Sequence, residues 1–505
     1  MPDVVVYRKR RGVELVMIVL ALVLGLGGYL LTHLNLYGKL PAVWPWAVGI
    51  TSAMAVAAHL VVRWRLPYAD PLILPLVTLL NGLGLAMIHR LDLANDPPMH
   101  SAELQLMWTG IAMAGFCLVV ALLRDHRVLQ RYTYTLFLVG MTLLMLPLVP
   151  GLGWENNGAQ IWIKVFGYTF QPAEVAKLVL SIAFASYLVD KREVLAMAGG
   201  RLLGIDLPRP RDLGPIMVMW LASLAVLVFQ KDLGTSLLFF GLFVMMLYVA
   251  TERPSWPILG TGLFASGAYL GYLFFDHVKV RVSSWLDPFA NYDQNYQVIQ
   301  AQFGMAWGGL FGTGWGMGRP NLIPLAKTDF ISAAIGEETG VTGLTAIMLI
   351  YGLIVARGLR ASLGAREPFG KLLAAGLSFV FAIQVFAILG GVTRLLPLTG
   401  LTTPFMSQGG SSLIANWVMV AVLMVITHLV RRPALDVPAE GPVASLAAET
   451  TQVISLDTSA PAVPIAEAKP APPAPEPALS TTPGTPSAPV VPAGADEPTV
   501  IRELP

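Results

Sequence analysis

Residues 372–390 read LLAAGLSFVFAIQVFAILG and contain no charged side chain. A helix needs about 20 mostly apolar residues to cross the hydrocarbon core of a bilayer. Lys371 lies directly before this run and Arg394 follows shortly after it, so charged residues bound it at both ends. The run therefore predicts a transmembrane helix, and it sets the fold class for the sequence around it.

Similar runs recur along residues 1–432 and predict an all-α polytopic membrane protein with about twelve transmembrane helices. They lie near 13–33, 42–62, 71–88, 105–123, 133–152, 172–189, 214–229, 234–250, 257–275, 332–356, 372–390 and 411–430. Of the 505 residues, 55% are hydrophobic and 13% are charged, whereas a soluble domain carries about 25% charged residues. This composition excludes an ordinary soluble domain.

The distribution of Lys and Arg supports an even number of spans. Cytoplasmic loops are enriched in these residues. With twelve spans and the N-terminus inside, the inside segments collect 21 of them and the outside segments nine. Losing one span in the middle would invert every later loop and remove this asymmetry. We therefore expect both termini to be cytoplasmic.

The last part of the chain differs in composition. Residues 433–505 hold 16 of the 38 prolines, nine acidic residues and two basic ones, and no Phe, Trp or Tyr. Such a segment cannot bury enough apolar surface to offset the entropy lost on ordering. It predicts a disordered, acidic, Pro- and Ala-rich cytoplasmic tail.

Glu174 and Lys177 are the first candidate site, in QPAEVAKLVL at 171–180. Ionisable residues within spans are costly and mark function by default, and the i, i+3 spacing places these two on one helical face. One interpretation is an ion pair that neutralises itself and pins two helices. The other is a pair lining a polar cavity, where Lys177 holds an anionic group such as phosphate and Glu174 orients it.

Asp329 is the second candidate, at the outer mouth of the tenth span in AKTDFISAAIGEETG. Thr328 or Asp329 could simply cap the helix that follows. Alternatively, Asp329 is a carboxylate in an outward cavity, placed to accept a proton from a sugar hydroxyl or to hold a divalent cation. Of Glu337 and Glu338, at least one must face inward or be paired, because two adjacent glutamates cannot both face lipid.

The loop between spans nine and ten, about 276–331, is long enough to predict a function or structure of its own. Its residues 293–307 could form an amphipathic helix on the membrane surface. The glycines between 304 and 318 predict tight turns or close backbone approach. They do not form a nucleotide loop, because no Gly-Lys-Ser/Thr follows and no strand precedes.

Other polar groups fall on the same predicted outer side and complete the case for a polar cavity there. They are Trp162 in the loop before span six, Lys231 and Asp232 in FQKDLGTS, and Arg394, Ser411 and Ser412 in or beside the loop before span twelve. Cys117 is the only cysteine, so an internal disulfide and thiolate metal clusters are excluded. The seven histidines show no metal-binding spacing.

Five stretches resemble, in the same order, hallmark stretches of the SEDS family (shape, elongation, division and sporulation; FtsW, RodA and SpoVE). They are NGAQIWI…FQPAEVAK, QKDLGTS, GGLFGTGW, TDFISAAIGEETG and LPLTGLTTPFMSQGGSS. The resemblance covers roughly 70–432 and is stronger to the RodA branch than to the FtsW branch. It implies a ten-helix core at 66–432, preceded by a cytoplasmic segment and two additional helices at 1–65.

The resemblance also implies an activity and a place. The family's enzymes are peptidoglycan glycosyltransferases that polymerise lipid II, the undecaprenyl-pyrophosphate-linked disaccharide-peptide, into glycan strands for cell elongation and shape or for division. They act at the outer face of the bacterial cytoplasmic membrane beside a class B penicillin-binding protein, which supplies transpeptidation. Asp329 matches the family's catalytic aspartate, and Mg²⁺ or Mn²⁺ is the cation that it could hold.

Other positions carry over less completely. Glu174 and Lys177 match the family's intramembrane pair, and Trp162 falls at the aromatic position of the preceding loop. The chain departs from the family pattern at Lys231, where proline is usual, at Lys327, where histidine is usual, and at Gln408, where tyrosine is usual.

Two rival functions stay open at this point. One is a flippase for a lipid-linked precursor, and the other is a non-enzymatic scaffold of the elongation or division machinery. A flippase needs polar groups along its whole transmembrane path, whereas the predicted polar groups cluster on the outer side.

Overall fold

The structure is a computed structural model that describes residues 9–42, 44–95, 97–156, 159–165, 167–195, 198–202, 205–208 and 214–433. All of the predicted tail (433–505) except residue 433, and residues 1–8 of the segment predicted to be cytoplasmic, lie outside the described residues.

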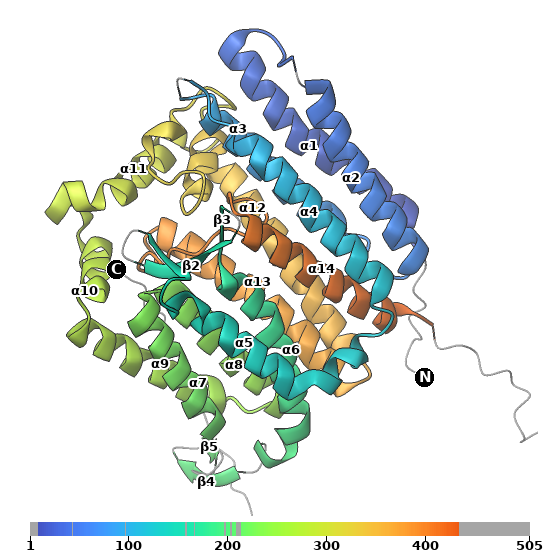
Figure 1. Ribbon diagram of the computed structural model, residues 1–505, viewed down its shortest axis with the longest axis vertical. Coiled ribbons are helices and arrows are strands. Elements are labelled where there is room, and N and C mark those ends of the chain that lie inside the picture. Colours follow the sequence, from blue (N-terminus) through green and yellow to red (C-terminus); the bar gives the residue numbers. More distant parts are fainter. Residues whose placement is uncertain are drawn as a thin grey trace, which may run out of the picture. The chain divides into compact units, whose positions relative to one another are not determined.

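Helices form most of the described chain (Figure 1). The long helices are α1 (Arg11–Tyr37), α2 (Trp44–Arg65), α3 (Ile73–Asp92), α4 (Ser101–Leu122), α5 (Thr133–Met145), α6 (Pro172–Leu195), α7 (Gly214–Ala225), α8 (Leu233–Thr251), α9 (Ser255–Phe274), α10 (Asp276–Leu286), α11 (Tyr292–Gly308), α12 (Ile331–Gly364), α13 (Pro368–Val392) and α14 (Gly410–Arg431). Short helical segments are η1 (His126–Tyr132), η2 (Leu146–Leu148), η4 (Val226–Gln230), η5 (Pro288–Asn291) and η6 (Pro320–Leu322).

Among the described residues, eleven helices are long and apolar enough to cross a membrane. The predicted seventh span is the exception, because it consists of the 12-residue helix α7 followed by five residues of π-helix in η4. The polytopic helical fold is confirmed. The predicted helix at 293–307 is also confirmed, since it lies within α11.

The sequence did not indicate two small antiparallel sheets between the spans. The first sheet has the order β1 (Gly153–Asn156), β2 (Ala159–Val165), β3 (Tyr168–Phe170) and pairs Trp154 with Trp162. The second pairs β4 (Ala198–Leu202) with β5 (Ile205–Pro208). Short strands between apolar runs are hard to predict because each carries only a few residues of alternating pattern.

Five helices, α3, α6, α8, α13 and α14, are mostly buried within the bundle, whereas most residues of the spans that contain α2, α5 and α9 are not buried. Small residues bring the central helices close together. A Cβ added to Gly376 of α13 would lie 2.8 Å from the sulfur of Met246 in α8. Small residues at helix contacts are typical of membrane bundles, where close packing rather than water exclusion holds helices together.

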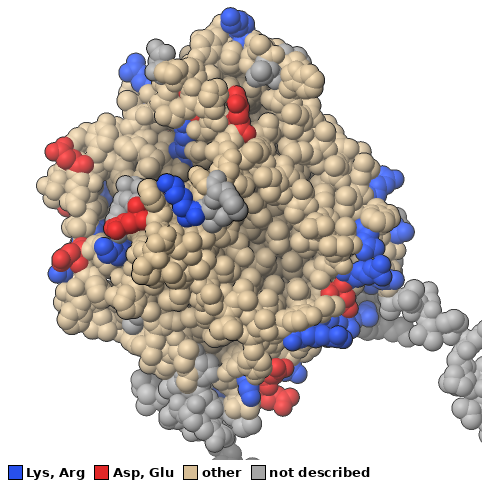
Figure 2. Space-filling view, in the orientation of Figure 1, with Lys and Arg blue, Asp and Glu red and all other residues tan. Residues whose placement is uncertain are grey.

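The two ends of the bundle differ. One end, called the cavity end below, carries the β1–β3 sheet, α10, α11 and the loops before α12 and α14 (Figure 1). The opposite end carries η1, β4–β5 and the start of α13. On the face in Figure 2, a broad area without Lys, Arg, Asp or Glu crosses the middle of the molecule, as expected for a membrane-embedded surface.

Candidate functional site

A cavity of about 1200 Å³ lies at the cavity end. Its walls come from β2, α10, α11 and the loops before α8, α12 and α14. Five of the predicted site residues line it: Trp162, Lys231, Asp232, Asp329 and Arg394. The other four predicted site residues are not part of its lining, namely Glu174, Lys177, Ser411 and Ser412. The prediction that distant outer-side segments converge on one cavity therefore matches the geometry for five residues of nine.

Asp329 is half-buried and stands two residues before the first residue of α12, Ile331. The N-cap position of this helix is occupied by Phe330, whose side chain makes no capping hydrogen bond. Neither Thr328 nor Asp329 therefore caps the helix, which removes the structural alternative that the sequence left open. The carboxylate remains on the cavity wall.

The surroundings of Asp329 alter its acidity. Burial raises the pKa of Asp329 from 3.8 to about 6, and the negative charge of Asp232 also raises this pKa. A hydrogen bond from Thr328 and the positive charge of Arg281 lower it in part. A carboxyl with a pKa near 6 is mostly ionised at pH 7 and is more basic than an exposed aspartate. It is therefore suited to accept a proton.

Arg281 of α10 is a cavity residue that the sequence did not single out. Its Nη1 donates to the carbonyl oxygens of Leu398, at 2.9 Å, and Thr399, at 3.1 Å. A Cβ added to Gly400 would lie 3.9 Å both from the guanidinium of Arg281 and from Oδ2 of Asp329. Gly400 has a φ of +74°, so this turn favours glycine. The guanidinium and the carboxylate thus flank the same glycine.

Asp232 is both a helix cap and a cavity residue. Its Oδ1 accepts from the backbone N–H of Thr235 at 3.0 Å, and its Oδ2 accepts from the Thr235 hydroxyl at 2.5 Å. Burial raises the pKa of Asp232, and the hydrogen bonds from Thr235 oppose this effect. Lys231 precedes it in a left-handed conformation with a φ of 56° and lines the cavity.

Arg394 also lines the cavity, but its guanidinium is engaged with the end of α10. Its Nη2 donates to the carbonyl oxygens of Trp285, at 2.9 Å, and Leu286, at 3.3 Å. In return, the indole N–H of Trp285 donates to the carbonyl oxygen of Arg394 at 2.9 Å. Arg394 therefore fixes α10, the helix that carries Arg281.

The Glu174–Lys177 pair is sealed inside the bundle. The side chain of Lys177 is 1% exposed, and its Nζ lies 2.5 Å from Oε2 of Glu174. The same Nζ donates to Oε1 of Gln384 at 3.0 Å and to Oδ1 of Asn416 at 2.9 Å. Lys177 Nζ thus has one ion-pair partner and two hydrogen-bond acceptors, all buried in the bundle. This geometry matches the ion-pair interpretation and leaves Lys177 without a route to an anion in the cavity.

Hydroxyl groups connect this pair to the cavity wall. Thr402 lines the cavity and donates to Oε1 of Glu174 at 3.1 Å. Its hydroxyl is also 2.9 Å from that of Ser412, which accepts from Nδ2 of Asn416 at 3.2 Å. Ser411 lies nearby and accepts from the backbone N–H of Gln171 at 3.3 Å. The pair therefore supports the floor of the cavity from below.

Glu337 and Glu338 are both buried and both paired. Oε1 of Glu337 accepts from the backbone N–H of Arg319 at 2.6 Å, and Oε1 of Glu338 accepts from Nε of Arg90 at 2.9 Å. The prediction that at least one of them faces inward or is paired is confirmed.

Two of the unusual residues of the motifs lie beside Asp329. Nζ of Lys327 is 2.5 Å from Oδ1 of Asp92 and 3.0 Å from the hydroxyl of Ser101. The backbone N–H of Gln408 donates to the carbonyl oxygen of Lys327 at 2.8 Å. Lys327 thus ties the segment that carries Asp329 to the end of α3 and the start of α4.

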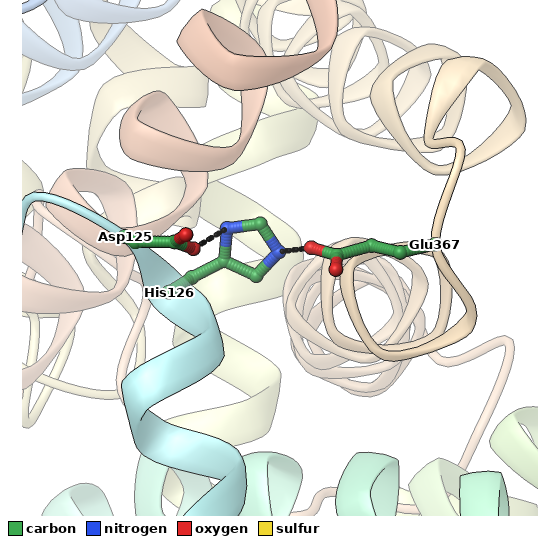
Figure 3. Close-up of side chains that lie close together, drawn as sticks. All are labelled: Asp125, His126 and Glu367. Atoms are coloured by element: carbon green, nitrogen blue, oxygen red, sulfur yellow. Dashed lines mark ion pairs between the residues drawn. The ribbon is translucent and has the colours of Figure 1, made fainter.

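In the described part of the chain, one group of three side chains has the spacing of a metal site (Figure 3). It lies where η1 and α13 begin, at the end of the bundle opposite the cavity. His126 sits between Asp125 and Glu367, with Nε2 2.6 Å from Glu367 Oε1 and Nδ1 3.7 Å from Asp125 Oδ1. Arg127 also pairs with Glu367. The nearby arginine already balances the carboxylates, so the group is better explained as a clasp between η1 and α13 than as a cation site.

Comparison with known proteins gives a consistent result. Residues 71–432 match the model of a family of cell cycle proteins, the FtsW/RodA/SpoVE family. The chain is 53% identical over 383 residues to the peptidoglycan glycosyltransferase RodA of Mycobacterium tuberculosis, covering 75% of this chain and 82% of that protein. It is 50% identical over 408 residues to RodA of Mycobacterium leprae, covering 80% and 86%.

A solved structure also resembles the fold. A chain from a peptidoglycan synthase complex, described as coordinating polymerisation and crosslinking, superimposes with a TM-score of 0.57 at 26% sequence identity. The match covers 72% of this chain and 99% of that one.

Proposed function

This chain belongs to the FtsW/RodA/SpoVE family of membrane glycosyltransferases, and from that premise we propose that it polymerises lipid II into glycan strands for cell elongation. The reaction takes place at the cavity end, which faces outward from the cytoplasmic membrane. Both termini are cytoplasmic in this proposal, as the distribution of Lys and Arg predicts.

One observation carries the proposal. The cavity holds a carboxylate, Asp329, that does not cap its helix and has a pKa raised to about 6. Basic residues share the cavity with it, namely Lys231, Arg281 and Arg394. A base of matched pKa beside cations suits glycosyl transfer from a diphosphate donor, because the base can accept a proton and the cations can stabilise the leaving diphosphate.

The chemistry follows from these groups. The hydroxyl of the acceptor sugar attacks the anomeric carbon of the donor, and Asp329 accepts the hydroxyl proton. The new carbon–oxygen bond forms as the bond from the anomeric carbon to the lipid diphosphate breaks, and the diphosphate leaves with the electron pair. Lys231 and Arg281 offset the negative charge that develops on it. A single displacement of this kind inverts the anomeric centre.

A divalent cation fits this site only in part. Mg²⁺ is commonly held by one or two carboxylates together with substrate phosphates, and Asp329 is the carboxylate placed to contribute. Asp232 is less suited, because both of its oxygens accept hydrogen bonds from Thr235. When bound, Mg²⁺ or Mn²⁺ would neutralise diphosphate charge.

The remaining assignments extend the proposal. Glu174, Lys177, Ser411 and Ser412 act as support for the cavity floor, and Trp162 offers an apolar surface on the cavity wall. A class B penicillin-binding protein is the proposed partner, because the related synthase complex combines polymerisation with crosslinking. The sealed Glu174–Lys177 pair favours a polymerase over a flippase. A flippase needs a polar path across the membrane, and the sealed pair does not provide one, whereas a polymerase does not need such a path.

Glycan synthesis by the purified protein tests the proposal. The protein is incubated with its cognate penicillin-binding protein, whose transpeptidase serine is blocked, with lipid II and with Mn²⁺ or Mg²⁺, and strands are resolved on a gel. Wild type is compared with Asp329→Asn and with Glu103→Gln, a 76% exposed carboxylate elsewhere in the chain. We expect strands from wild type and Glu103→Gln, and none from Asp329→Asn.

Other results would point elsewhere. Equal strands from all three proteins would reject Asp329 as the base. No strands from any of them, together with lipid II translocation across vesicles, would favour the flippase. Neither activity would leave the scaffold function.

A further inference from the structure

The N-terminal helix α1 precedes the segment that matches the family, residues 71–432, yet it contacts the loop that leads to Asp329. Four residues of α1 carry the contact: Gly25, Gly28, Thr32 and Asn35. Their spacing of three, four and three places them on one stripe of the helix. Two glycines in this stripe leave room for neighbouring groups to reach the helix backbone.

The lower part of the stripe packs on α3. A Cβ added to Gly25 would lie 2.9 Å from the Cα of Gly82, and one added to Gly82 would lie 3.1 Å from the Cα of Gly25. The two helices therefore meet backbone to backbone at this crossing. Larger side chains at either position would push them apart.

The upper part of the stripe holds the glycine-rich loop. A Cβ added to Gly28 would lie 3.1 Å from the indole ring of Trp315, and one added to Gly316 would lie 2.9 Å from the carbonyl oxygen of Thr32. Nδ2 of Asn35 donates to the carbonyl oxygen of Trp315 at 2.7 Å. The Trp315–Gly316 turn is thus held by close packing against α1 and by a hydrogen bond from Asn35.

The same loop is bound to α12 on its other side. The backbone N–H groups of Thr313 and Gly314 donate to the carbonyl oxygens of Glu337 and Glu338, at 3.1 and 2.9 Å. These two glutamates also accept from Arg319 and Arg90, as described above. The loop is therefore wedged between α1 and the first turns of α12, which begins two residues after Asp329.

The path from this wedge to Asp329 is short and itself fixed. Arg90 of α3 donates to the carbonyl oxygen of Gly318 at 2.7 Å, and Lys327 pairs with Asp92 at the end of the same helix. Helix α3 thus holds the segment 318–327 at both ends, and α1 holds α3 and the start of the segment.

From these contacts we propose that α1 is a positioning element of the active site, which acts through Trp315 and the α12 start to hold Asp329 in place. The inference rests on the proposed function and assigns a role to the part of the chain outside the family core. Loss of the contact lowers turnover without removing any group from the cavity.

Two adjacent glycines of α1 provide a matched test. Gly28 meets Trp315, whereas a Cβ added to Gly27 meets nothing within 4 Å. Gly28→Leu and Gly27→Leu place the same side chain one residue apart in the same helix. We expect kcat for glycan synthesis to fall about tenfold in Gly28→Leu and to stay within twofold of wild type in Gly27→Leu. Gly28→Ala should give an intermediate loss, because its methyl group needs only a small shift of the ring.

The pH profile separates a shifted site from a smaller folded fraction. A displaced Asp329 becomes more hydrated, so the acid midpoint of activity should fall below the wild-type value in Gly28→Leu and stay unchanged in Gly27→Leu. A smaller active fraction alone would scale the whole profile and leave the midpoint in place. Equal rates and equal midpoints in the two leucine variants would overturn the proposal.

A disulfide tests the contact without measuring activity. An added Cβ on Gly316 would lie 3.5 Å from Cβ of Asn35, within the range that a disulfide spans. In a Cys117→Ala background, Asn35→Cys with Gly316→Cys should crosslink on oxidation, whereas Gly27→Cys with Gly316→Cys should not. The oxidised protein should polymerise at the rate of its reduced form. Because Gly316 has a φ of +80° and its added Cβ would lie 2.9 Å from the Thr32 carbonyl oxygen, thermal unfolding first checks that both cysteine variants are folded. A folded Asn35→Cys, Gly316→Cys protein that does not crosslink would overturn the contact, even if no variant makes glycan.

Discussion

Asp329 and the Glu174–Lys177 pair look alike in the sequence, because each places ionisable side chains beside or within a span. The structure separates them. The carboxylate of Asp329 lies on the wall of a large cavity, whereas the ammonium of Lys177 is buried with an ion-pair partner and two hydrogen-bond acceptors. A charge in a membrane protein therefore indicates chemistry only where its partners leave it incomplete and accessible.

Replacing Asp329 should cause the largest loss of glycan synthesis. Asp329→Asn removes the proposed base but keeps the size of the side chain, so we expect glycan synthesis to fall by about 10³-fold, within the range of general base catalysis. Thermal unfolding at pH 8 should not show a loss of stability. A fall in both activity and melting temperature would mean that Asp329 has a structural role.

Breaking the Glu174–Lys177 pair should show the opposite behaviour. Lys177→Met leaves Glu174 as a buried, unpaired carboxylate, and such changes cost about 3–5 kcal/mol of folding free energy. The double variant Glu174→Gln with Lys177→Met should recover much of the stability, because neither charge remains buried. Denaturation of the detergent-solubilised proteins measures this, and a double variant as unstable as the single one would contradict a self-neutralised pair.

Arg281 links the accessible carboxylate of Asp329 to the loop before α14. Arg281→Gln removes a charge that lowers the pKa of Asp329. We expect turnover to fall by about tenfold to a hundredfold and the acid midpoint of the pH–rate profile to move upward. Arg281→Lys keeps the charge and should hold the midpoint nearer to that of wild type. A midpoint that is equal in all three proteins would separate Arg281 from Asp329.

The pH dependence of activity should show the smallest of these effects. The pKa of Asp329 is raised to about 6, and the proposed mechanism needs its ionised form, so activity should rise with pH through about 6 and level off above it. Asp232→Asn removes a negative charge that raises this pKa, so the midpoint should move downward. Initial rates measured between pH 4.5 and 8 test both expectations, and an upward shift in Asp232→Asn would contradict the assigned electrostatics.

The sign of the stability effect follows from the same pKa. The pKa of Asp329 is higher in the folded protein than its ordinary value of 3.8, so ionisation of this group opposes folding. Its favourable contribution is complete below about pH 4 and is lost as the pH rises through about 6. Asp329→Asn should therefore be as stable as wild type at pH 8, or more stable by up to about 3 kcal/mol.

The sequence predicted the features that depend on local patterns. Apolar runs located the spans, and the i, i+3 spacing of Glu174 and Lys177 placed them together. The prediction that at least one of Glu337 and Glu338 faces inward or is paired followed from the cost of exposing charge to lipid. Each of these inferences needs only neighbouring residues and the properties of the bilayer.

Features that depend on distant contacts could not be predicted in this way. Arg281 reaches the carbonyl oxygens of Leu398 and Thr399, more than a hundred residues away. Asn35 reaches Trp315 over an even longer interval. Glycines at 25 and 28 gave no signal of their own, because their role depends on which helix and which ring pack against them.

The most direct test of the central claim compares initial rates of glycan synthesis at saturating lipid II for two proteins. One is Asp329→Asn, and the other is the double variant Glu174→Gln with Lys177→Met. If Asp329 is the base and the pair is structural, the first loses about a thousandfold and the folded double variant stays within about tenfold of wild type. If Asp329→Asn retains wild-type rates while the double variant is folded but inactive, the chemistry belongs to the pair and the account is wrong.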